Sequence, residues 1–228
     1  KDLLVSTDML LEGIHFDLTY VPLKHLGYKA AVVNFSDIYA MNGKPEQLTV
    51  ALACSNRFPL EAIEQIYEGL LLACNEYGVD LVGGDTASSK AGLLLSLTII
   101  GAVEPGKAVY RSGAKTGDLI VVSGDLGGAY MGLQLLEREK AVFMETPGAQ
   151  PDLQGFDYIL QRQLRPEARR DVVEFLAENA IQPNAMIDIS DGLSSEILHL
   201  CTQSNTGCRV FEDKLPIDPT TVNLAREF

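Results

Sequence analysis

The chain has 228 residues, a formal net charge of −13 at pH 7 and an apolar content of 46%. This length and composition fit a globular protein with one large or two small domains. The negative charge argues against nucleic acid and against an anionic membrane as partners, and no apolar run is long enough to span a bilayer. A protein this acidic needs cations between itself and the phosphates of any phosphorylated ligand.

The four cysteines, Cys54, Cys74, Cys201 and Cys208, show no CxxC spacing. We therefore expect reduced thiols in a cytoplasmic protein rather than a zinc site or disulfides. No positively charged segment precedes an apolar signal run, so no signal peptide is expected. The opening KDLLVSTD reads like the middle of a protein, and we expect further residues upstream.

Strand-like and helix-like runs alternate in the first hundred residues. The helix over Pro22–Met41 has proline in its first turn, and a second amphipathic helix over Pro59–Tyr77 is stopped by Gly78. Strands are expected at Leu3–Thr7, Leu48–Cys54, Val79–Val82 and Leu93–Val103. A mixed sheet is the expected result, and we expect its strands Leu48–Cys54 and Leu93–Val103 to take part in dimerisation.

A segment rich in turn residues and charges, Glu104–Asp118, marks a domain boundary. We therefore divide the chain into residues 1–104 and 105–228. The second part is expected to contain strands at Leu119–Ser123 and Ala185–Ile189, helices at Gly128–Arg138, Glu167–Asn179 and Leu193–Gln203, and a long surface loop at Ala141–Asp157. The fold class is α/β with two domains.

Acidic residues follow apolar runs at several places, namely Asp8, Asp85, Asp125, and Asp188 with Asp191. In open α/β sheets, ligands bind at the carboxyl ends of strands, so these acids predict a ligand site. Aspartate also favours turns and helix caps, which is the alternative for each one taken singly.

Asp37 shares one face of its predicted helix with Leu26, Ala30 and Val33. A carboxylate at the edge of a core must be paired, hydrogen-bonded or bound to metal, unless it lies at a solvated helix end. Hard carboxylate oxygens without His or Cys favour Mg²⁺ over zinc. Arg111, in the turn-rich segment, could bind phosphate oxygens or be an ordinary surface arginine.

The run MIDISDGLSSEI over Met186–Ile197 combines two carboxylates and a hydroxyl. Asp188 and Ser190, two apart on a strand end, are expected to point to one side. Asp191 can cap the helix that begins near Leu193, and a helix N-terminus favours phosphate. No P-loop, G-x-G-x-x-G or protein-kinase motif is present, so metals and backbone amides must hold any phosphates.

Five ordered motifs resemble those of bacterial thiamine-monophosphate kinases. They are STDMLLEGIHF (6–16), VNFSDIYAMNGKP (33–45), LVGGDT (81–86), RSGAKTGD (111–118) and IDISDGL (187–193). Their order and spacing agree over nearly the whole chain, and LPID (215–218) fits as well. Asn42 departs from the pattern, since relatives often have glycine there.

The resemblance implies the fold shared with aminoimidazole-ribonucleotide synthetase and selenophosphate synthetase. Each chain then has two α/β domains, the N-terminal sheets pair in a homodimer, and ATP lies in a cleft near the interface. The implied reaction converts ATP and thiamine monophosphate to ADP and thiamine diphosphate by in-line transfer with several Mg²⁺ ions. The family also has an upstream paired-Asp motif and a C-terminal segment over the thiamine rings, and neither appears in this chain.

The resemblance also assigns site residues. Those expected to hold Mg²⁺ are Thr7, Asp8, Asp37, Asp85, Asp188 and Asp191. Those expected to contact ATP are Tyr67, Gly84, Asp85, Arg111 and Ser190. His15 is expected to contact the thiamine phosphate. No side chain is expected to act as a general base, because the acceptor is already an anionic phosphate and metals neutralise the charge.

Two alternatives remain open at this point. One is another ATP-using synthetase of the same superfamily, which the EGIHF run argues against. The other is a non-catalytic nucleotide-binding or metal-binding relative, which the acids retained in every motif argue against. No role is assigned to Asp125.

Overall fold

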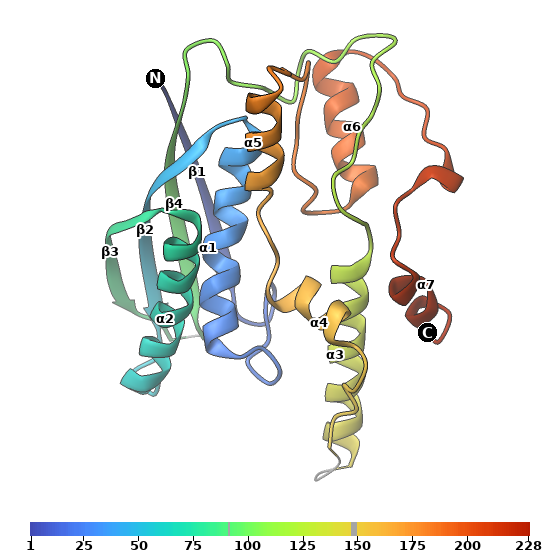
Figure 1. Ribbon diagram of the computed structural model, residues 1–228. Coiled ribbons are helices and arrows are strands. Elements are labelled where there is room, and N and C mark those ends of the chain that lie inside the picture. Colours follow the sequence, from blue (N-terminus) through green and yellow to red (C-terminus); the bar gives the residue numbers. More distant parts are fainter. Residues whose placement is uncertain (91, 147–149) are drawn as a thin grey trace.

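The computed structural model describes residues 1–90, 92–146 and 150–228 (Figure 1). Its elements in chain order are β1 (Asp2–Leu11), α1 (Leu23–Ala40), β2 (Lys44–Cys54), α2 (Leu60–Tyr77), β3 (Asp80–Ser88), β4 (Leu94–Val103), α3 (Gly128–Glu145), α4 (Asp157–Leu164), α5 (Arg170–Glu178), α6 (Leu193–Ser204), the short 3₁₀ helix η1 (Glu212–Lys214) and α7 (Pro219–Ala225). Within these described ranges, no helix has both the length and the apolar character needed to cross a bilayer.

The strands form one mixed sheet in the order β1-β4-β2-β3. β4 pairs antiparallel with β1 and with β2, and β2 pairs parallel with β3. The expected mixed α/β class is therefore confirmed. The strands predicted at Leu48–Cys54 and Leu93–Val103 are the two inner ones, so β1 and β3 carry the unpaired edges.

Helices α1 and α2 pack on one face of this sheet (Figure 1). The inward side chains of β4, Leu95, Leu97 and Ile99, are fully buried beneath them. The two helices approach backbone to backbone at Gly27 and Gly69. A Cβ on Gly69 would lie 1.9 Å from the Lys24 carbonyl oxygen, so only glycine permits this helix pair.

The part of residues 104–228 that the structure describes contains no strand. The strands predicted at Leu119–Ser123 and Ala185–Ile189 are thus wrong. Their apolar residues are present but have no neighbouring strand to pair with, and a strand is stable only within a ladder. Leu119 and Val121 are consequently 89% and 85% exposed.

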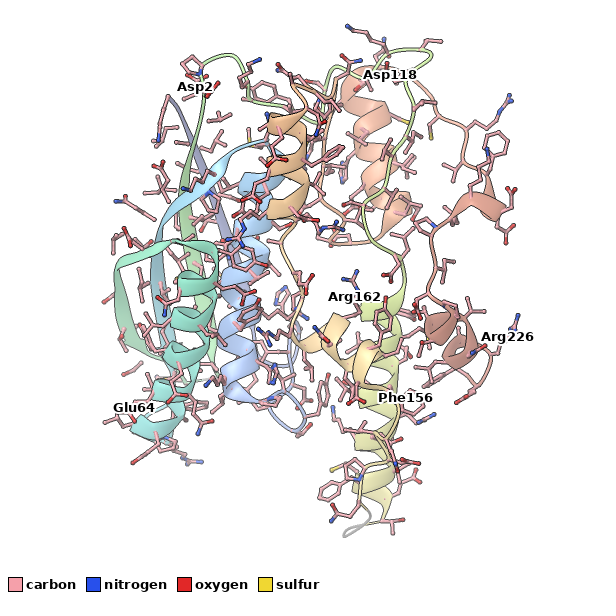
Figure 2. All side chains as sticks on the ribbon, viewed as in Figure 1. Asp2, Glu64, Asp118, Phe156, Arg162 and Arg226 are labelled. Carbon is pink, nitrogen blue, oxygen red and sulfur yellow. The ribbon has the colours of Figure 1, made fainter. Side chains whose placement is uncertain are left out.

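A second, smaller core joins α3, α4 and α7 through Met131, Leu135, Ile159 and Leu224. Arg162, labelled in Figure 2, lies where α4 meets the start of α3 and donates to the Asp125 carbonyl oxygen. The loop predicted at Ala141–Asp157 is shorter than expected, because α3 continues to Glu145. Residues 147–149 of that prediction lie outside the described residues.

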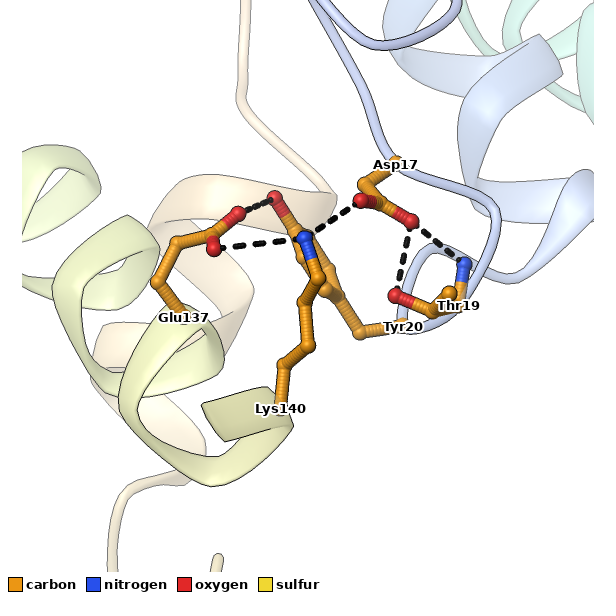
Figure 3. A network of polar contacts seen from close by, with 5 residues as sticks. All are labelled: Asp17, Thr19, Tyr20, Glu137 and Lys140. Carbon is orange, nitrogen blue, oxygen red and sulfur yellow. Dashed lines mark hydrogen bonds and ion pairs between the residues drawn. The ribbon is translucent and has the colours of Figure 1, made fainter. Parts of the chain in front are cut away.

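A polar network joins the loop before α1 to α3 (Figure 3). Lys140 pairs with Asp17 at 2.7 Å and with Glu137 at 3.4 Å, and the Tyr20 hydroxyl donates to Glu137 at 2.6 Å. Hydrogen bonds from Lys140 and Thr19 lower the pKa of Asp17 to about 2. This network is a direct contact across the boundary expected near residue 104.

Candidate active site

Two hydrogen bonds join the C-terminal half of α1 to two segments that are distant in the sequence, β1 and the stretch around Asp188. The Ser6 hydroxyl on β1 donates to Asp37 at 2.5 Å, and the Ser36 hydroxyl donates to Asp188 at 2.8 Å. Side chains alternate along β1, so Asp8 faces α1 together with Ser6. We call Asp8, Asp37 and Asp188 the carboxylate cluster.

The carboxylates of the cluster repel one another. Burial, and to a smaller extent the charges of Asp188 and Asp8, raise the pKa of Asp37 to about 6, against the opposing effects of the Ser6 hydrogen bond and the Arg111 charge. Burial and Asp188 also raise the pKa of Asp8. Asp37 lies in the last turn of α1, where the helix dipole disfavours an anion. The cluster is therefore a site that costs stability unless cations occupy it.

The donor set of the cluster consists of carboxylate and hydroxyl oxygens, which are ligands that Mg²⁺ accepts. Among the described residues, no three His, Cys, Asp or Glu side chains form a ready-made metal cage. This arrangement fits Mg²⁺, because that ion keeps several waters and is commonly shared between one or two protein carboxylates and substrate phosphates.

The hypothesis that these acids lie at the ends of strands is wrong. Asp8 is inside β1, paired with Leu97 of β4, and Asp85 is inside β3, paired with Ala51 of β2. Asp188 follows an extended segment that is not a strand. The cluster arises instead from the face of β1 that meets α1.

Thr7 lies on the opposite face of β1 from Asp8. Its hydroxyl donates to the Leu97 carbonyl oxygen at 2.8 Å and lies 2.9 Å from the Thr98 hydroxyl. The structure therefore does not bring the Thr7 side chain to the carboxylate cluster. Ser6 is a residue that sequence reasoning missed, although the alternation of side chains along β1 could have indicated it.

Three of the residues expected to bind ATP, Tyr67, Gly84 and Asp85, line one open pocket of about 520 Å³. Tyr67 comes from α2 and packs partly against the core, whereas Gly84 and Asp85 lie on β3. Gly84 has a packing role of its own, because a Cβ there would lie 2.0 Å from the Val50 carbonyl oxygen. The size of the pocket suits a small-molecule ligand.

This pocket and the carboxylate cluster lie at opposite edges of the same sheet. In the pairing of the four strands, Asp8 on β1 is aligned with Gly84 on β3. Asp85 is aligned with Met9, whose side chain points to the face of the sheet away from α1. Three strand spacings separate the two edges, which is roughly 14 Å. Within one chain, Asp8 and Asp85 therefore cannot bind a common metal ion.

The turn before α6 presents Ser190 and Asp191. The N-cap of α6 is Gly192, with φ +121°, and none of the described side chains caps the helix, so the prediction that Asp191 would cap α6 is wrong. The acceptor at this helix N-terminus is Glu196 instead. Its Oε1 accepts from the backbone N–H groups of Asp191 at 2.9 Å and Ser190 at 3.2 Å.

The predicted phosphate contacts Arg111 and His15 lie near the cluster. Arg111 follows Tyr110, whose carbonyl accepts from the Met186 N–H at 3.0 Å, and its charge acts on Asp37. His15 is exposed, and its Nδ1 accepts from the Leu11 N–H at 3.0 Å. The neutral imidazole therefore carries its proton on Nε2, which has no hydrogen-bond acceptor among the described residues and can donate to a ligand.

Asp125 has structural partners within the second core. Its carboxylate accepts from the Tyr158 hydroxyl at 2.5 Å and lies 4.0 Å from Arg162. The network ties the start of α3 to α4, so the structure does not group Asp125 with the carboxylate cluster.

Comparisons with known proteins agree with these motifs. Residues 1–103 match the family of AIR synthase related proteins, N-terminal domain. The chain is 36% identical over 214 residues to a thiamine-monophosphate kinase of Bacillus subtilis. It superposes on the crystal structure of thiamine monophosphate kinase from Aquifex aeolicus with a TM-score of 0.84 and 33% identity, covering 99% of this chain and 72% of that one. The chain belongs to the thiamine-monophosphate kinase family.

The match covers nearly all of this chain but only part of each relative. The match covers 94% of this chain but 63% of the B. subtilis thiamine-monophosphate kinase. A second solved structure, AaThiL complexed with AMPPCP and TMP, has a TM-score of 0.85 and 33% identity and is covered to 68%.

The structure also accounts for the departure of Asn42 from the thiamine-monophosphate kinase pattern. Asn42 has φ +62°, a left-handed conformation that glycine adopts easily and asparagine tolerates. Its side-chain amide donates to the Lys107 carbonyl oxygen at 3.1 Å. Asparagine thus fits the turn and adds a contact to the segment that leads to Arg111.

Proposed function

We propose that this protein transfers the γ-phosphoryl group of ATP to thiamine monophosphate, giving ADP and thiamine diphosphate. The observation that carries the proposal is the convergence of Asp8, Asp37 and Asp188 from three separate segments. Family membership supports the choice of substrates, since a structural neighbour is complexed with AMPPCP and TMP.

The role of the cluster is to hold Mg²⁺ ions that neutralise the phosphates of both substrates. Asp8, Asp37 and Asp188 supply the oxygen ligands, and Asp191 extends the set at the start of α6. Magnesium, when bound, supplies charge neutralisation and a template for in-line displacement. The repulsion among the three carboxylates gives the apo protein a built-in preference for cations.

The remaining residues position the two substrates. Tyr67, Gly84 and Asp85 form a nucleotide pocket, the guanidinium of Arg111 binds nucleotide phosphates, and the oxygen of the Ser190 hydroxyl contacts the magnesium–nucleotide complex. His15 donates from Nε2 to the phosphate of thiamine monophosphate. That phosphate is itself the anionic nucleophile, so the side chains need only orient it and exclude competing water.

We further propose a two-fold homodimer in which the β1 edge of one chain lies beside the β3 edge of its partner. Leu3, Val5 and Met9 are 71%, 58% and 51% exposed on the face of β1 away from α1, and a partner sheet would cover them. The same pairing would bring Asp85 of one chain toward Asp8 of the other, which one chain alone cannot do.

The division into domains 1–104 and 105–228 and the cytoplasmic location stay predictions. Two separate cores support the division. Ala168 belongs to the first core, however, and its N–H donates to the Tyr77 hydroxyl at 3.0 Å, so the second part packs closely on the first.

The proposal is tested by measuring ADP formation from ATP by the full-length protein, with and without thiamine monophosphate and Mg²⁺. We expect turnover only when all components are present. Calorimetry with a non-hydrolysable ATP analogue gives the second reading. Magnesium-dependent binding without turnover would identify a non-catalytic relative and refute the proposal.

A further inference from the structure

Glu196 is a buried carboxylate that has no part in the proposed phosphoryl transfer. It lies in the first turn of α6 and is only 3% exposed. Its Oε1 accepts three hydrogen bonds, from the Asp191 N–H, the Ser190 N–H and the Ser190 hydroxyl at 3.4 Å. Its Oε2 is buried and has no hydrogen-bond partner among the described residues.

Burying the Glu196 carboxylate in this way lowers the stability of the folded protein. A buried carboxylate loses its hydration, and an oxygen without a partner is not compensated for that loss. A helix could be capped more cheaply by a Ser, Thr, Asp or Asn side chain at the Gly192 position. Glu196 instead reaches back past the cap to the two residues that precede it.

The contacts of Glu196 have a specific geometric effect on the turn. Ser190 and Asp191 precede the N-cap, Gly192, so their backbone N–H groups are not among the free N–H groups of the first turn of α6. Here the N–H groups of Ser190 and Asp191 are directed inward to Glu196. Gly192, with φ +121°, allows the chain to fold over the carboxylate in this way. The amides of Ser190 and Asp191 are therefore occupied, and these two residues offer their side chains to a ligand.

We infer that Glu196 is a positioning residue that fixes the Ser190–Asp191 turn, so that the Asp191 carboxylate and the Ser190 hydroxyl are held ready for a magnesium–nucleotide ligand. This inference rests on the proposed function. It assigns Glu196 no contact with the ligand, because Glu196 acts through the two residues it binds.

The experiment compares two nearly isosteric variants with a control on the same helix. Glu196→Gln keeps an acceptor at Oε1, whereas Glu196→Met fills the space without one. His199→Ala removes an exposed side chain of α6. Two quantities are measured for each protein: hydrogen exchange at the amides of Ser190 and Asp191 without ligand, and the affinity for a magnesium complex of a non-hydrolysable ATP analogue.

We expect Glu196→Met to accelerate exchange at both amides by about tenfold or more, because their acceptor is lost. Its affinity for the magnesium–nucleotide complex should fall about 10- to 100-fold, as is typical when residues behind metal ligands are removed. Glu196→Gln and His199→Ala should resemble the wild type in both measurements.

Each other outcome overturns the inference. Unchanged amide exchange in Glu196→Met would show that Glu196 does not hold the turn. Faster exchange with unchanged affinity would show a purely structural contact, and equal loss of affinity in Glu196→Gln would show that the charge itself is required. If the wild type does not bind the complex at all, the proposed function fails, and the amide exchange still reports separately on the contact.

Discussion

The Ser6 hydroxyl on β1 donates to the Asp37 carboxylate in the last turn of α1 across 2.5 Å. This bond fixes the position of a carboxylate that burial, Asp188 and Asp8 all disfavour. The Asp37 carboxylate is thus held in place at a cost in folding stability. Such costs are common at sites where a charged side chain binds a ligand.

Asp37→Asn should make the protein without Mg²⁺ more stable at pH 7. The pKa of Asp37 is raised to about 6 in the folded protein, so the folded state binds more protons than the unfolded state between about pH 4 and 6. The free energy of unfolding of the wild type therefore falls as the pH rises through this window. Because Asp37 is partly exposed, we expect a gain of about 1–2 kcal/mol for the variant at pH 7 and none below pH 4.

This gain is measured by urea unfolding at both pH values, with the exposed Asp213→Asn as control. The same Asp37→Asn variant should have lost phosphoryl transfer, since it lacks one of the magnesium ligands that we propose. A variant that is no more stable than the wild type, or one with wild-type turnover at saturating Mg²⁺, would contradict the assignment of Asp37.

The separation of Asp8 from Asp85 predicts complementation between inactive variants. Asp8→Asn and Asp85→Asn should each be inactive as homodimers. Mixed dimers of the two would have one site with both substitutions and one site with neither, so random mixing should restore about a quarter of the wild-type activity.

Mixing Asp8→Asn with Asp37→Asn is the matched control. These two residues lie in the same cluster of one chain, so every site in the mixed dimer keeps one substitution and stays inactive. Recovery in the control, or none in the Asp8–Asp85 mixture once mixed dimers are isolated, would argue against a site shared between chains.

His15→Ala should weaken the binding of thiamine monophosphate, the phosphoryl acceptor, without weakening the binding of ATP. The proton of the neutral His15 ring lies on Nε2, because Nδ1 accepts from the Leu11 N–H. Losing a hydrogen bond to a charged phosphate costs about 1.5–3 kcal/mol, or roughly 10- to 100-fold in affinity. We expect the KM for thiamine monophosphate to rise by this factor and that for ATP to change little. Equal changes in both, or none, would remove His15 from the acceptor site.

Gly69→Ala should destabilise the first core. The added methyl group would lie 1.9 Å from the Lys24 carbonyl oxygen, so α1 and α2 would have to separate. Overpacking of this kind costs about 1–3 kcal/mol or more. Gly207→Ala is the control, because a Cβ there meets no atom of the described part of the chain within 4 Å. Thermal unfolding compares the two, and equal stability would show that the helix pair tolerates a wider spacing.

The sequence was sufficient for the first half of the fold because its patterns are local. The periodicity of Pro59–Tyr77 and the glycine after it predict α2, which ends at Tyr77 with Gly78 left-handed. The order of the motifs likewise indicated the family. Local patterns could not predict whether Leu119–Ser123 and Ala185–Ile189 form strands, because a strand also needs another segment alongside to pair with.

The grouping of site residues was harder to predict than their identity. Asp8 and Asp37 were singled out from local patterns, but their meeting depends on how α1 crosses β1. Ser6 and Glu196 escaped notice because neither belongs to a recognisable metal pattern. Each shows its role only through a contact with a residue that was already suspected, Asp37 for Ser6 and Asp191 for Glu196.

The proposed reaction is direct transfer between two phosphates held over the carboxylate cluster. The most direct measurement follows ATP labelled in its γ-phosphate when it is incubated with the full-length protein, thiamine monophosphate and Mg²⁺. For direct transfer, we expect the label to appear in thiamine diphosphate at the rate at which ADP forms, and chelation of Mg²⁺ to abolish both. Label that appears only in inorganic phosphate, or that stays in ATP while Mg²⁺ and thiamine monophosphate are saturating, would contradict it.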